Sequence, residues 1–180
     1  MSDAADLQSL QALVGDLQAR LKLSEDREAI WRLMMAMQDA IDGRDIPAYA
    51  NNFTEDGVWA GVVGRGVGPA GVLEILGKYM KDWTDQSART FHTTLDVVID
   101  IDGDTATSTS KFQHIKHADD GTLEVWHLGA YDDELVRTPQ GWKFSQRHAY
   151  VIIPYMEPKF QQVGAEDRPK EWTQRRGCRQ

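Results

Sequence analysis

The spacing of apolar residues changes near position 90, and this change constrains the fold more than any other feature of the chain. Before it, apolar residues recur every three or four positions, which is typical of amphipathic helices. After it, they alternate with polar residues in four runs, at about 90–101, 105–117, 123–137 and 142–154. The short links between these runs are rich in Gly, Asp and Pro, as in β-hairpins. Helices followed by an antiparallel meander predict an α+β domain, not a parallel α/β one.

The helical half divides into several predicted elements. The first helix covers about residues 6–23, and Ser24 with the acidic residues after it predicts a fresh helix that ends near Asp42, with Gly43 as a left-handed cap. A short helix at about 46–53, a strand at 58–60, a glycine-rich stretch at 61–71 and a helix at 72–83 follow. The predicted organisation is an N-terminal helical extension at 1–23, one domain at 24–158 and a tail at 159–180.

Composition narrows the class of protein. A chain of 180 residues with 41% hydrophobic content has room for one core and not for two comfortable domains. A net charge of -8 argues against a surface built for nucleic acid or anionic lipid. The single cysteine, Cys178, excludes an internal disulfide and fits a reducing cytoplasm. Neither a signal peptide nor a membrane span is predicted.

Three separated polar residues carry a hypothesis about chemistry. Asp42 ends a helical apolar stripe, His92 begins a strand, and Arg147 lies in the last strand. Together they would supply an orienting carboxylate, a base and an anion stabiliser. Each also has a simpler interpretation: Asp42 as ordinary turn chemistry, His92 as a surface residue opposite the apolar Phe91, and Arg147 as the partner of a surface acid. By strict alternation His92 shares a face with Thr94 and Asp96.

A family resemblance adds to this interpretation. The segments AIWRLMMAMQDAIDGRD, FTEDGVW, RTFHTTLDVVID and GWKFSQRHAY, spread over roughly residues 28–155, resemble the SnoaL-like branch of the nuclear-transport-factor-2-like superfamily. The resemblance implies a cone-shaped α+β barrel, in which a curved antiparallel sheet wraps around helices. It also implies a largely apolar pocket for one small hydrophobic ligand.

Within that superfamily the chain resembles the lyase group of scytalone dehydratase and hexachlorocyclohexane dehydrochlorinase. The helix-end Asp and strand-start His of that group fall on Asp42 and His92, and the last-strand arginine of the dehydrochlorinase falls on Arg147. The chain departs from the dehydrochlorinase at Met37, where that enzyme carries a lysine. This departure disfavours chloride stabilisation and favours packing against a neutral ring.

Further residues are predicted to bind substrate. Met34, Met37, Tyr49 and Trp59 fall near the pocket wall of the family, and aromatic and thioether side chains suit a planar aromatic ligand. His114 and His127 are candidates for a second pocket histidine, since some dehydratase-like relatives have one. The histidine spacing matches no zinc signature and no dinucleotide fingerprint is present, so neither a metal nor another cofactor is predicted.

These expectations combine into a cofactor-independent lyase. It would eliminate water, a one-carbon fragment such as formaldehyde, or both from a small hydrophobic aromatic alcohol, with lignin-type diaryl diols as one substrate class. The alternatives are a ketosteroid-type isomerase and a non-catalytic ligand-binding domain. A homo-oligomer is also predicted, a trimer rather than a dimer, because Phe91, Leu95, Val97 and Ile99 would form an apolar outer face on one strand.

Overall fold

The structure, a computed structural model, describes residues 2–80, 90–118, 120–154 and 156. Within them lie three helices and six strands. The helices are α1 (Ser2–Asp42), α2 (Ile46–Ala50) and α3 (Gly68–Tyr79). The strands are β1 (Phe53–Gly61), β2 (Gly64–Val67), β3 (Thr90–Asp102), β4 (Thr105–His117), β5 (Leu123–Thr138) and β6 (Gly141–Ile153).

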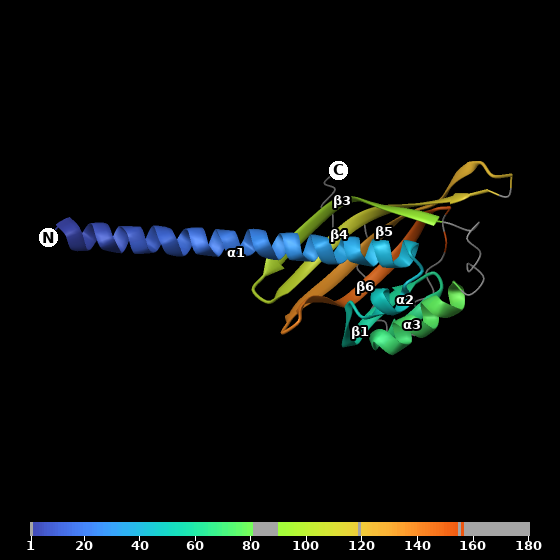
Figure 1. Ribbon diagram of the computed structural model, residues 1–180, viewed down its shortest axis with the longest axis horizontal. Helices are drawn as coiled ribbons and strands as arrows, with labels where there is room; N and C mark the ends of the chain where they lie inside the picture. Colours follow the sequence, from blue (N-terminus) through green and yellow to red (C-terminus); the bar gives the residue numbers. More distant parts are fainter. Residues whose placement is uncertain (1, 81–89, 119, 155, 157–180) are drawn as a thin grey trace, which may run out of the picture.

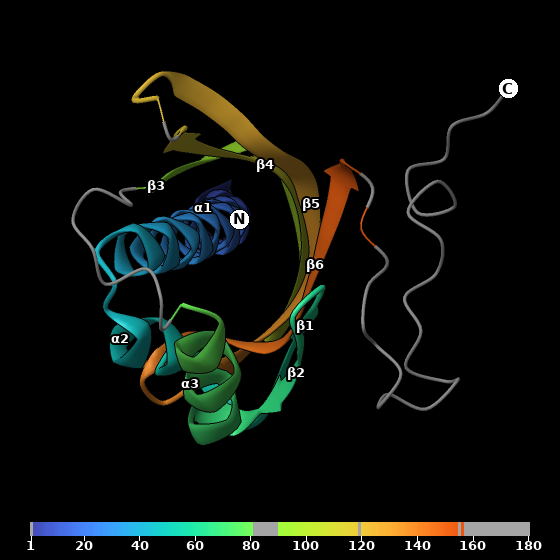
Figure 2. The ribbon, with the colours of Figure 1, turned by 90° about the vertical axis from the view of Figure 1, so that its right-hand side faces the viewer.

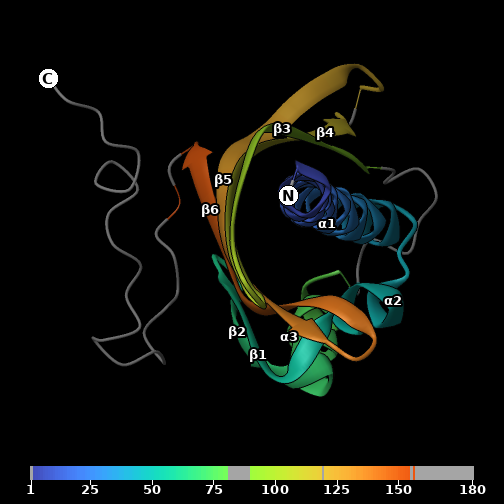
Figure 3. The ribbon, with the colours of Figure 1, turned by 90° about the vertical axis from the view of Figure 1, so that its left-hand side faces the viewer.

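The strands form one sheet in the order β2-β1-β6-β5-β4-β3. The sheet curves around the helices, which fill its concave side (Figures 2 and 3). The predicted α+β class is therefore confirmed, and so is the antiparallel meander from β3 to β6. The sheet is not antiparallel throughout, however, because β1 pairs with β6 in parallel. Hairpin turns fix the direction of sequential strands, but nothing local in the sequence fixes the pairing of β1 with β6.

Helix α1 is one continuous helix of 41 residues, and about its first half projects from the domain (Figure 1). The predicted fresh start at Ser24 is wrong, because no Gly or Pro between residues 16 and 42 interrupts the helix. The predicted left-handed cap is also displaced by one residue. Arg44, with φ of 62°, has that conformation, and Gly43 does not.

The connection from α1 to the meander holds more structure than predicted. Strand β1 is longer than the expected 58–60, and it forms a hairpin with β2, which lies inside the glycine-rich stretch. Helix α3 begins at Gly68, four residues earlier than predicted. The last apolar residue of that predicted helix, Trp83, lies outside the described residues, as does the predicted tail at 159–180.

The hydrophobic core lies between the concave face of the sheet and the inner face of α1. The predicted stripe on this helix contributes Ile30, Met34 and Met37, which are all buried. Asp26 fixes the same helix to the β5–β6 hairpin, since both its carboxylate oxygens accept hydrogen bonds from Arg137, at 2.7 and 2.6 Å. Core packing and this ion pair therefore both help to fix the position of α1 along the sheet.

A β-bulge in β3 decides which residues of this strand face the core. The register with β4 shifts between Leu95 and Val98, and Asp96 has φ of 52°. The extra residue reverses the alternation, so that His92 and Val97 both face inward. Strict alternation, which put these two residues on opposite faces, is therefore wrong here.

The bulge also changes the outer apolar face from which oligomerisation was predicted. Phe91, Leu95 and Val98 are exposed, whereas Val97 and Ile99 pack against the core. The predicted homo-oligomer thus loses two of its four supporting residues and remains a prediction. Separately, no helix among the described residues is long and apolar enough to cross a membrane.

Candidate active site

Asp42 and His92 form a hydrogen-bonded pair at the C-terminal end of α1. Oδ1 of Asp42 lies 2.6 Å from Nδ1 of His92, and Oδ2 accepts a hydrogen bond of 2.8 Å from the backbone N–H of His92. Both carboxylate oxygens therefore bind the same residue, which fixes the position of the carboxylate. With Nδ1 donating to Asp42, the neutral imidazole carries its lone pair on Nε2.

The backbone of His92 is fixed by a second residue of α1. Gln38 donates a hydrogen bond of 2.5 Å to the His92 carbonyl oxygen, and Thr94 donates one of 2.6 Å to the Gln38 side-chain oxygen. Gln38 lies one helical turn before Asp42, so both residues project from the same face of the helix. Three hydrogen bonds to one residue hold the start of β3 against the end of α1.

Three histidines lie in a row across β3, β4 and β5. The strand register pairs His92 with His114 and His114 with His127. The rings of His92 and His114 are stacked, with centroids 4.0 Å apart, and Nδ1 of His127 lies 3.5 Å from Nδ1 of His114. A bulge at Trp126, beside His127, shifts the β4–β5 register at this point. The sheet therefore brings together all three histidines that were predicted for the site.

Burial makes two of these histidines poor proton acceptors. His114 is only 4% exposed, and its pKa falls from 6.5 to about 2 because burial penalises the charged form and the nearby His92 and His127 repel a proton. Burial also lowers the pKa of His127, assisted by the positive charge of Lys116. Both are therefore neutral near pH 7, and they serve as hydrogen-bonding groups.

The histidine row opens onto a cavity of about 110 Å³. Most of its lining is apolar or aromatic, and it comes from all three helices, the sheet and the turn between β1 and β2. The residues that line it are Ile41, Tyr49, Trp59, Val62, Val63, Leu76, Tyr79, Met80, His92, Phe112, His114, His127, Tyr131, Ala149 and Val151. Such a lining, with a few convergent polar groups, suits a small hydrophobic ligand that carries one or two oxygen atoms.

Tyr49 supplies a hydroxyl group at the cavity wall. This oxygen accepts a hydrogen bond of 3.1 Å from Nε1 of Trp59, and the positive charge of Arg147 acts on it electrostatically. Burial raises the pKa of Tyr49, so its hydroxyl keeps its proton. Since Trp59 donates to this oxygen, the hydroxyl proton is the group that Tyr49 can offer to a ligand.

Arg147 lies one layer behind the cavity. Its guanidinium forms a two-point ion pair with Asp133, at 2.8 and 2.9 Å, and both residues are buried. Although burial opposes the charge, the neighbouring Asp133 holds the pKa of Arg147 above its usual value. The guanidinium also lies over the Tyr131 ring, 4.4 Å from its centroid. Arg147 thus lies behind Tyr49 and Tyr131, which line the cavity. The sequence predicts direct contact between Arg147 and the ligand, and the structure does not place Arg147 in the lining.

Met34 and Met37 also differ from expectation, since neither lines the cavity. Both lie in the core on the inner face of α1. The sulfur of Met37 lies 3.6 Å from Nη1 of Arg147, and that of Met34 lies 4.0 Å from the Ser108 hydroxyl. Met34 precedes Asp42 by about two helical turns and Met37 by more than one. Tyr49, Trp59, His114 and His127, by contrast, are all in the lining.

Sequence reasoning missed Tyr131, Asp133 and Gln38. Tyr131 and Asp133 alternate on β5 in the segment AYDDEL, but period-two alternation does not say which of two neighbouring aspartates faces inward. The buried Arg147 required an acid within reach, and that requirement was the only available signal for Asp133. Gln38 precedes Asp42 by four residues, a spacing that places both on one helix face.

The described residues contain no group of three or more His, Cys, Asp or Glu side chains arranged to hold a metal ion. The three histidines in the row are stacked or tilted against one another, with His114 and His127 tilted by 49°.

Comparison with known proteins places this fold and site in a family. The SnoaL-like domain family matches residues 22–148, which is more than half of the chain. The chain belongs to the SnoaL-like domain family. No curated protein matches it in the corresponding search. The SnoaL-like segment begins within α1 and ends in β6, so it includes Asp42, His92, the histidine row and Arg147.

Solved structures share the SnoaL-like fold. A nuclear-transport-factor-2-like protein with a cystatin-like fold from Novosphingobium aromaticivorans is 28% identical, with a TM-score of 0.68 over 76% of this chain and 88% of that one. A protein from the same organism, described as a candidate aromatic ring hydroxylase, is 27% identical, with a TM-score of 0.60 over 76% and 95%. A Mycobacterium tuberculosis protein of unknown function is 22% identical, with a TM-score of 0.64 over 72% and 73%.

Proposed function

We propose that this SnoaL-like protein is a cofactor-independent lyase that acts on a small hydrophobic aromatic alcohol. The observation that carries the proposal is the 2.6 Å contact between Asp42 and His92 at the wall of an apolar cavity. A carboxylate bound to Nδ1 orients the imidazole and stabilises its protonated form, so that Nε2 can act as a base. Elimination requires a base and a group that accepts the developing charge, and both are available here.

His92 is the proposed general base. His114 and His127 keep their rings neutral, because burial lowers the pKa of each. A proton taken up from the substrate therefore resides on His92, beside the Asp42 carboxylate, and does not move along the row. His92 can return the same proton to the leaving oxygen, so one residue serves as base and then as acid.

Tyr49 is the proposed donor to the leaving hydroxyl or to a developing oxyanion. Its oxygen already accepts a hydrogen bond from Trp59 and lies in the electrostatic field of Arg147, and both make the hydroxyl a stronger donor. Arg147, held by Asp133, supplies positive charge one layer behind this hydroxyl. Arg147 is therefore proposed as a positioning residue that acts through Tyr49.

The proposed reaction balances without an added reactant. In simple dehydration His92 removes a proton from carbon, a carbon–carbon double bond forms, and the hydroxyl leaves as water after it receives that proton. In a 1,3-diol carrying two aryl groups, His92 would remove the proton of the terminal hydroxyl. The adjacent carbon–carbon bond would then break, with release of formaldehyde, a diaryl alkene and water. Neither route changes the overall oxidation state.

The lining of the cavity and one relative support an aromatic substrate. Tyr49, Trp59, Phe112 and Tyr131 present ring faces or edges at the wall. The Novosphingobium relative described as a candidate aromatic ring hydroxylase is 27% identical in sequence to this chain. An aromatic ligand is thus a reasonable first substrate class, with lignin-type diaryl diols as its most specific member.

The hydrogen bonding of the acidic residues favours a lyase over a ketosteroid-type isomerase. Such an isomerase uses a carboxylate, and not an imidazole, as the base that moves the proton. Here both oxygens of Asp42 are bound to His92, and both oxygens of Asp133 are bound to Arg147. The described lining of the cavity contains no carboxylate. An imidazole base is the better match.

The experiment that tests this function measures products. Purified protein is incubated with a phenolic 1,2-diarylpropane-1,3-diol and with a simple phenolic benzylic alcohol, and alkene, formaldehyde and water-loss products are quantified. We expect alkene from at least one substrate, in equal amount with formaldehyde if the diol is cleaved. His92→Ala should abolish the products, whereas His117→Ala, at an exposed histidine, should not. Turnover that His92→Ala leaves intact, or tight binding with no product, would favour another base or a binding domain.

A further inference from the structure

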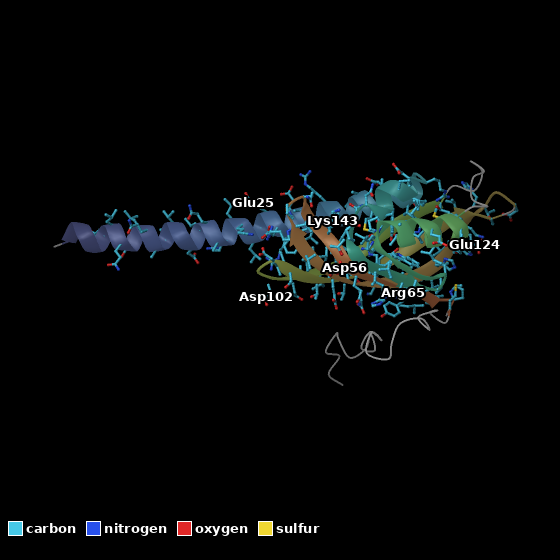
Figure 4. The ribbon with its side chains drawn as sticks, turned by 90° about the horizontal axis from the view of Figure 1, so that it is seen from below. Glu25, Asp56, Arg65, Asp102, Glu124 and Lys143 are labelled. Atoms are coloured by element: carbon cyan, nitrogen blue, oxygen red, sulfur yellow. The ribbon has the colours of Figure 1, made fainter. Side chains whose placement is uncertain are left out.

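The projecting half of α1 carries an apolar stripe that nothing in the described domain covers. Figure 4 shows that the helix leaves the domain near the labelled Glu25 and that the side chains on the N-terminal side of this residue are exposed to solvent. The large apolar side chains on this segment are each more than half exposed, at 51–58%. They are Leu7, Leu10, Leu13, Val14, Leu17 and Leu21. Contiguous apolar surface of this kind on a free helix marks an interaction site.

The spacing of these residues is that of a coiled coil. Leu7, Val14 and Leu21 are separated by seven residues, and Leu10 and Leu17 lie three residues after the first two of them. The intervals of three and four therefore alternate through five positions, which are the a and d positions of consecutive heptads. A single surface helix packed on its own domain would instead drift with a period of 3.6 residues.

We propose that residues 7–21 of α1 form a parallel coiled coil with the same segment of a second copy of this chain. A heptad stripe is self-complementary, since each layer brings a residue against its own counterpart across a two-fold axis. Leucine occupies both d positions, and the β-branched Val14 lies at the central a position between Leu7 and Leu21; leucine at d with a β-branched central a layer is the pattern of two strands. This proposal rests on the helix alone and is independent of the proposed function and of the outer sheet face.

The flanking charges are compatible with the parallel arrangement. In register, each g residue lies opposite the e residue of the next heptad on the other helix. This pairs Arg20 of one copy with Glu25 of the other, an attractive contact made twice by symmetry. The two earlier pairs, Asp6 with Gln11 and Leu13 with Gln18, contain no like charges. None of these three pairs therefore opposes association.

The docked half of the helix lowers the cost of forming the coil. An isolated helix of this length is marginal in water, because its first turn is costly to nucleate. Here residues from Asp26 onward are held against the sheet by Arg137 and by the core, so the helix is already nucleated at its C-terminal half. Packing of the apolar stripe against a partner helix then stabilises the projecting segment of α1, which is roughly 30 Å long.

The first test is the mass of the full chain in solution. Sedimentation equilibrium compares wild type with Leu10→Glu/Leu17→Glu, which places charges in two d layers. The matched control is Ala12→Glu/Ala19→Glu, with the same charges on the opposite face of the helix. We expect the d-position variant to lose at least tenfold in association constant and to lose helical ellipticity, with the control unchanged. A monomeric wild type, or equal association by wild type and d-position variant, would overturn the proposal.

The second test reads the direction of the helices. In a Cys178→Ser background, Leu10→Cys is oxidised in the full chain, and covalent dimer is measured on a non-reducing gel. Parallel pairing brings position 10 against itself, so we expect ready cross-linking that Ala12→Cys does not give. An antiparallel pair would bring position 10 against position 21, and cross-linking only in the mixed Leu10→Cys and Leu21→Cys sample would overturn the parallel arrangement.

Discussion

The imidazole of His114 is stacked on that of His92, with ring centroids 4.0 Å apart and an angle of 21° between the ring planes. Burial holds the pKa of His114 at about 2, so the His114 ring is a poor proton acceptor. His92 thus contacts the Asp42 carboxylate through Nδ1 and a neutral imidazole through its ring face. This arrangement is the reason that His92, and not His114, is the proposed base.

His114 should make the protein less stable in mild acid. Because the folded pKa of about 2 lies below the unfolded value near 6.5, the unfolded chain binds more protons between these limits. The free energy of unfolding should thus fall as pH drops below about 6.5, by up to about 1.4 kcal/mol per pH unit from this one group. Urea unfolding at pH 7.5, 6 and 5 should show a smaller fall in His114→Gln. His117→Gln, at an exposed site, should keep the slope of wild type.

The ion pair between Asp26 and Arg137 should contribute to stability above pH 4. Arg137 lowers the pKa of the Asp26 carboxyl well below its usual value, through two short hydrogen bonds. A depressed acid stabilises the fold above its unfolded pKa, near 3.9, and the contribution is lost as pH falls toward the folded value. We expect Asp26→Asn to lower the free energy of unfolding at pH 7 by about 2 kcal/mol.

Denaturant titration measures the Asp26 effect against a matched control. Asp16→Asn removes an acid on the projecting part of the same helix, 3.9 Å from an exposed Arg20. That change should alter stability by less than about 0.5 kcal/mol. Equal losses in the two variants would show that the Asp26 pair does not anchor α1.

Gly129 should not tolerate a side chain. A Cβ atom at this position would lie 2.2 Å from the ring of Phe112 and 2.2 Å from the backbone oxygen of Tyr150. Since the backbone oxygen cannot move away easily, Gly129→Ala should destabilise the protein by about 3 kcal/mol. Thermal unfolding can compare it with Gly77→Ala, where a Cβ has open space and the helical position favours alanine. A harmless Gly129→Ala would contradict the close packing of Phe112 at the cavity wall.

Much of the fold follows from the sequence because hairpin turns and periodicity are local signals. The turns at Gly103, Gly121 and Gly141 fix three strand boundaries, and each of these glycines has a positive φ. The parallel pairing of β1 with β6 has no such local signal, since it depends on how the sheet closes around the helices. Element types are therefore predictable here, and one non-local strand pairing is not.

The candidate site shows the same division between local and non-local signals. Asp42 and His92 were found by position and resemblance, but strict alternation argued that His92 faced outward. The bulge at Asp96, which reverses the alternation, leaves no clear signal in the segment TLDVVID. The ion pair of Arg147 with Asp133 was equally hidden, because its partner is set by sheet register.

Tyr49 should matter for turnover more than for binding. Tyr49→Phe removes the hydroxyl that is proposed to donate to the leaving oxygen, and kcat should fall by about 10-fold or more with a smaller change in KM. Trp59→Phe, which removes a hydrogen bond to the same oxygen, should give a weaker effect in the same direction. Tyr79→Phe, at the partly exposed edge of the cavity, is the control. Equal kcat values for Tyr49→Phe and Tyr79→Phe would rule out the proposed donor.

Activity should survive removal of metals. The proposed reaction needs a base, a donor and positive charge, and His92, Tyr49 and Arg147 supply these. After exhaustive dialysis against a chelator, the rate should remain within error of the untreated protein, with no gain on addition of zinc or iron. A rate that disappears on chelation and returns with added metal would contradict this prediction and would make His114, His117 and His127 the candidate metal ligands.

The most direct test of the account is the single-turnover rate of Asp42→Asn, His92→Ala and the double variant on a phenolic diaryl diol, with circular dichroism to verify the fold. Each single change should lower the rate by at least about 100-fold, and the double variant should be little slower than the slower single variant, because the two residues act as one unit. Asp39→Asn, an exposed acid on the same helix, should retain the wild-type rate. A near-wild-type rate in either single variant, or losses that multiply in the double variant, would contradict the Asp42–His92 base.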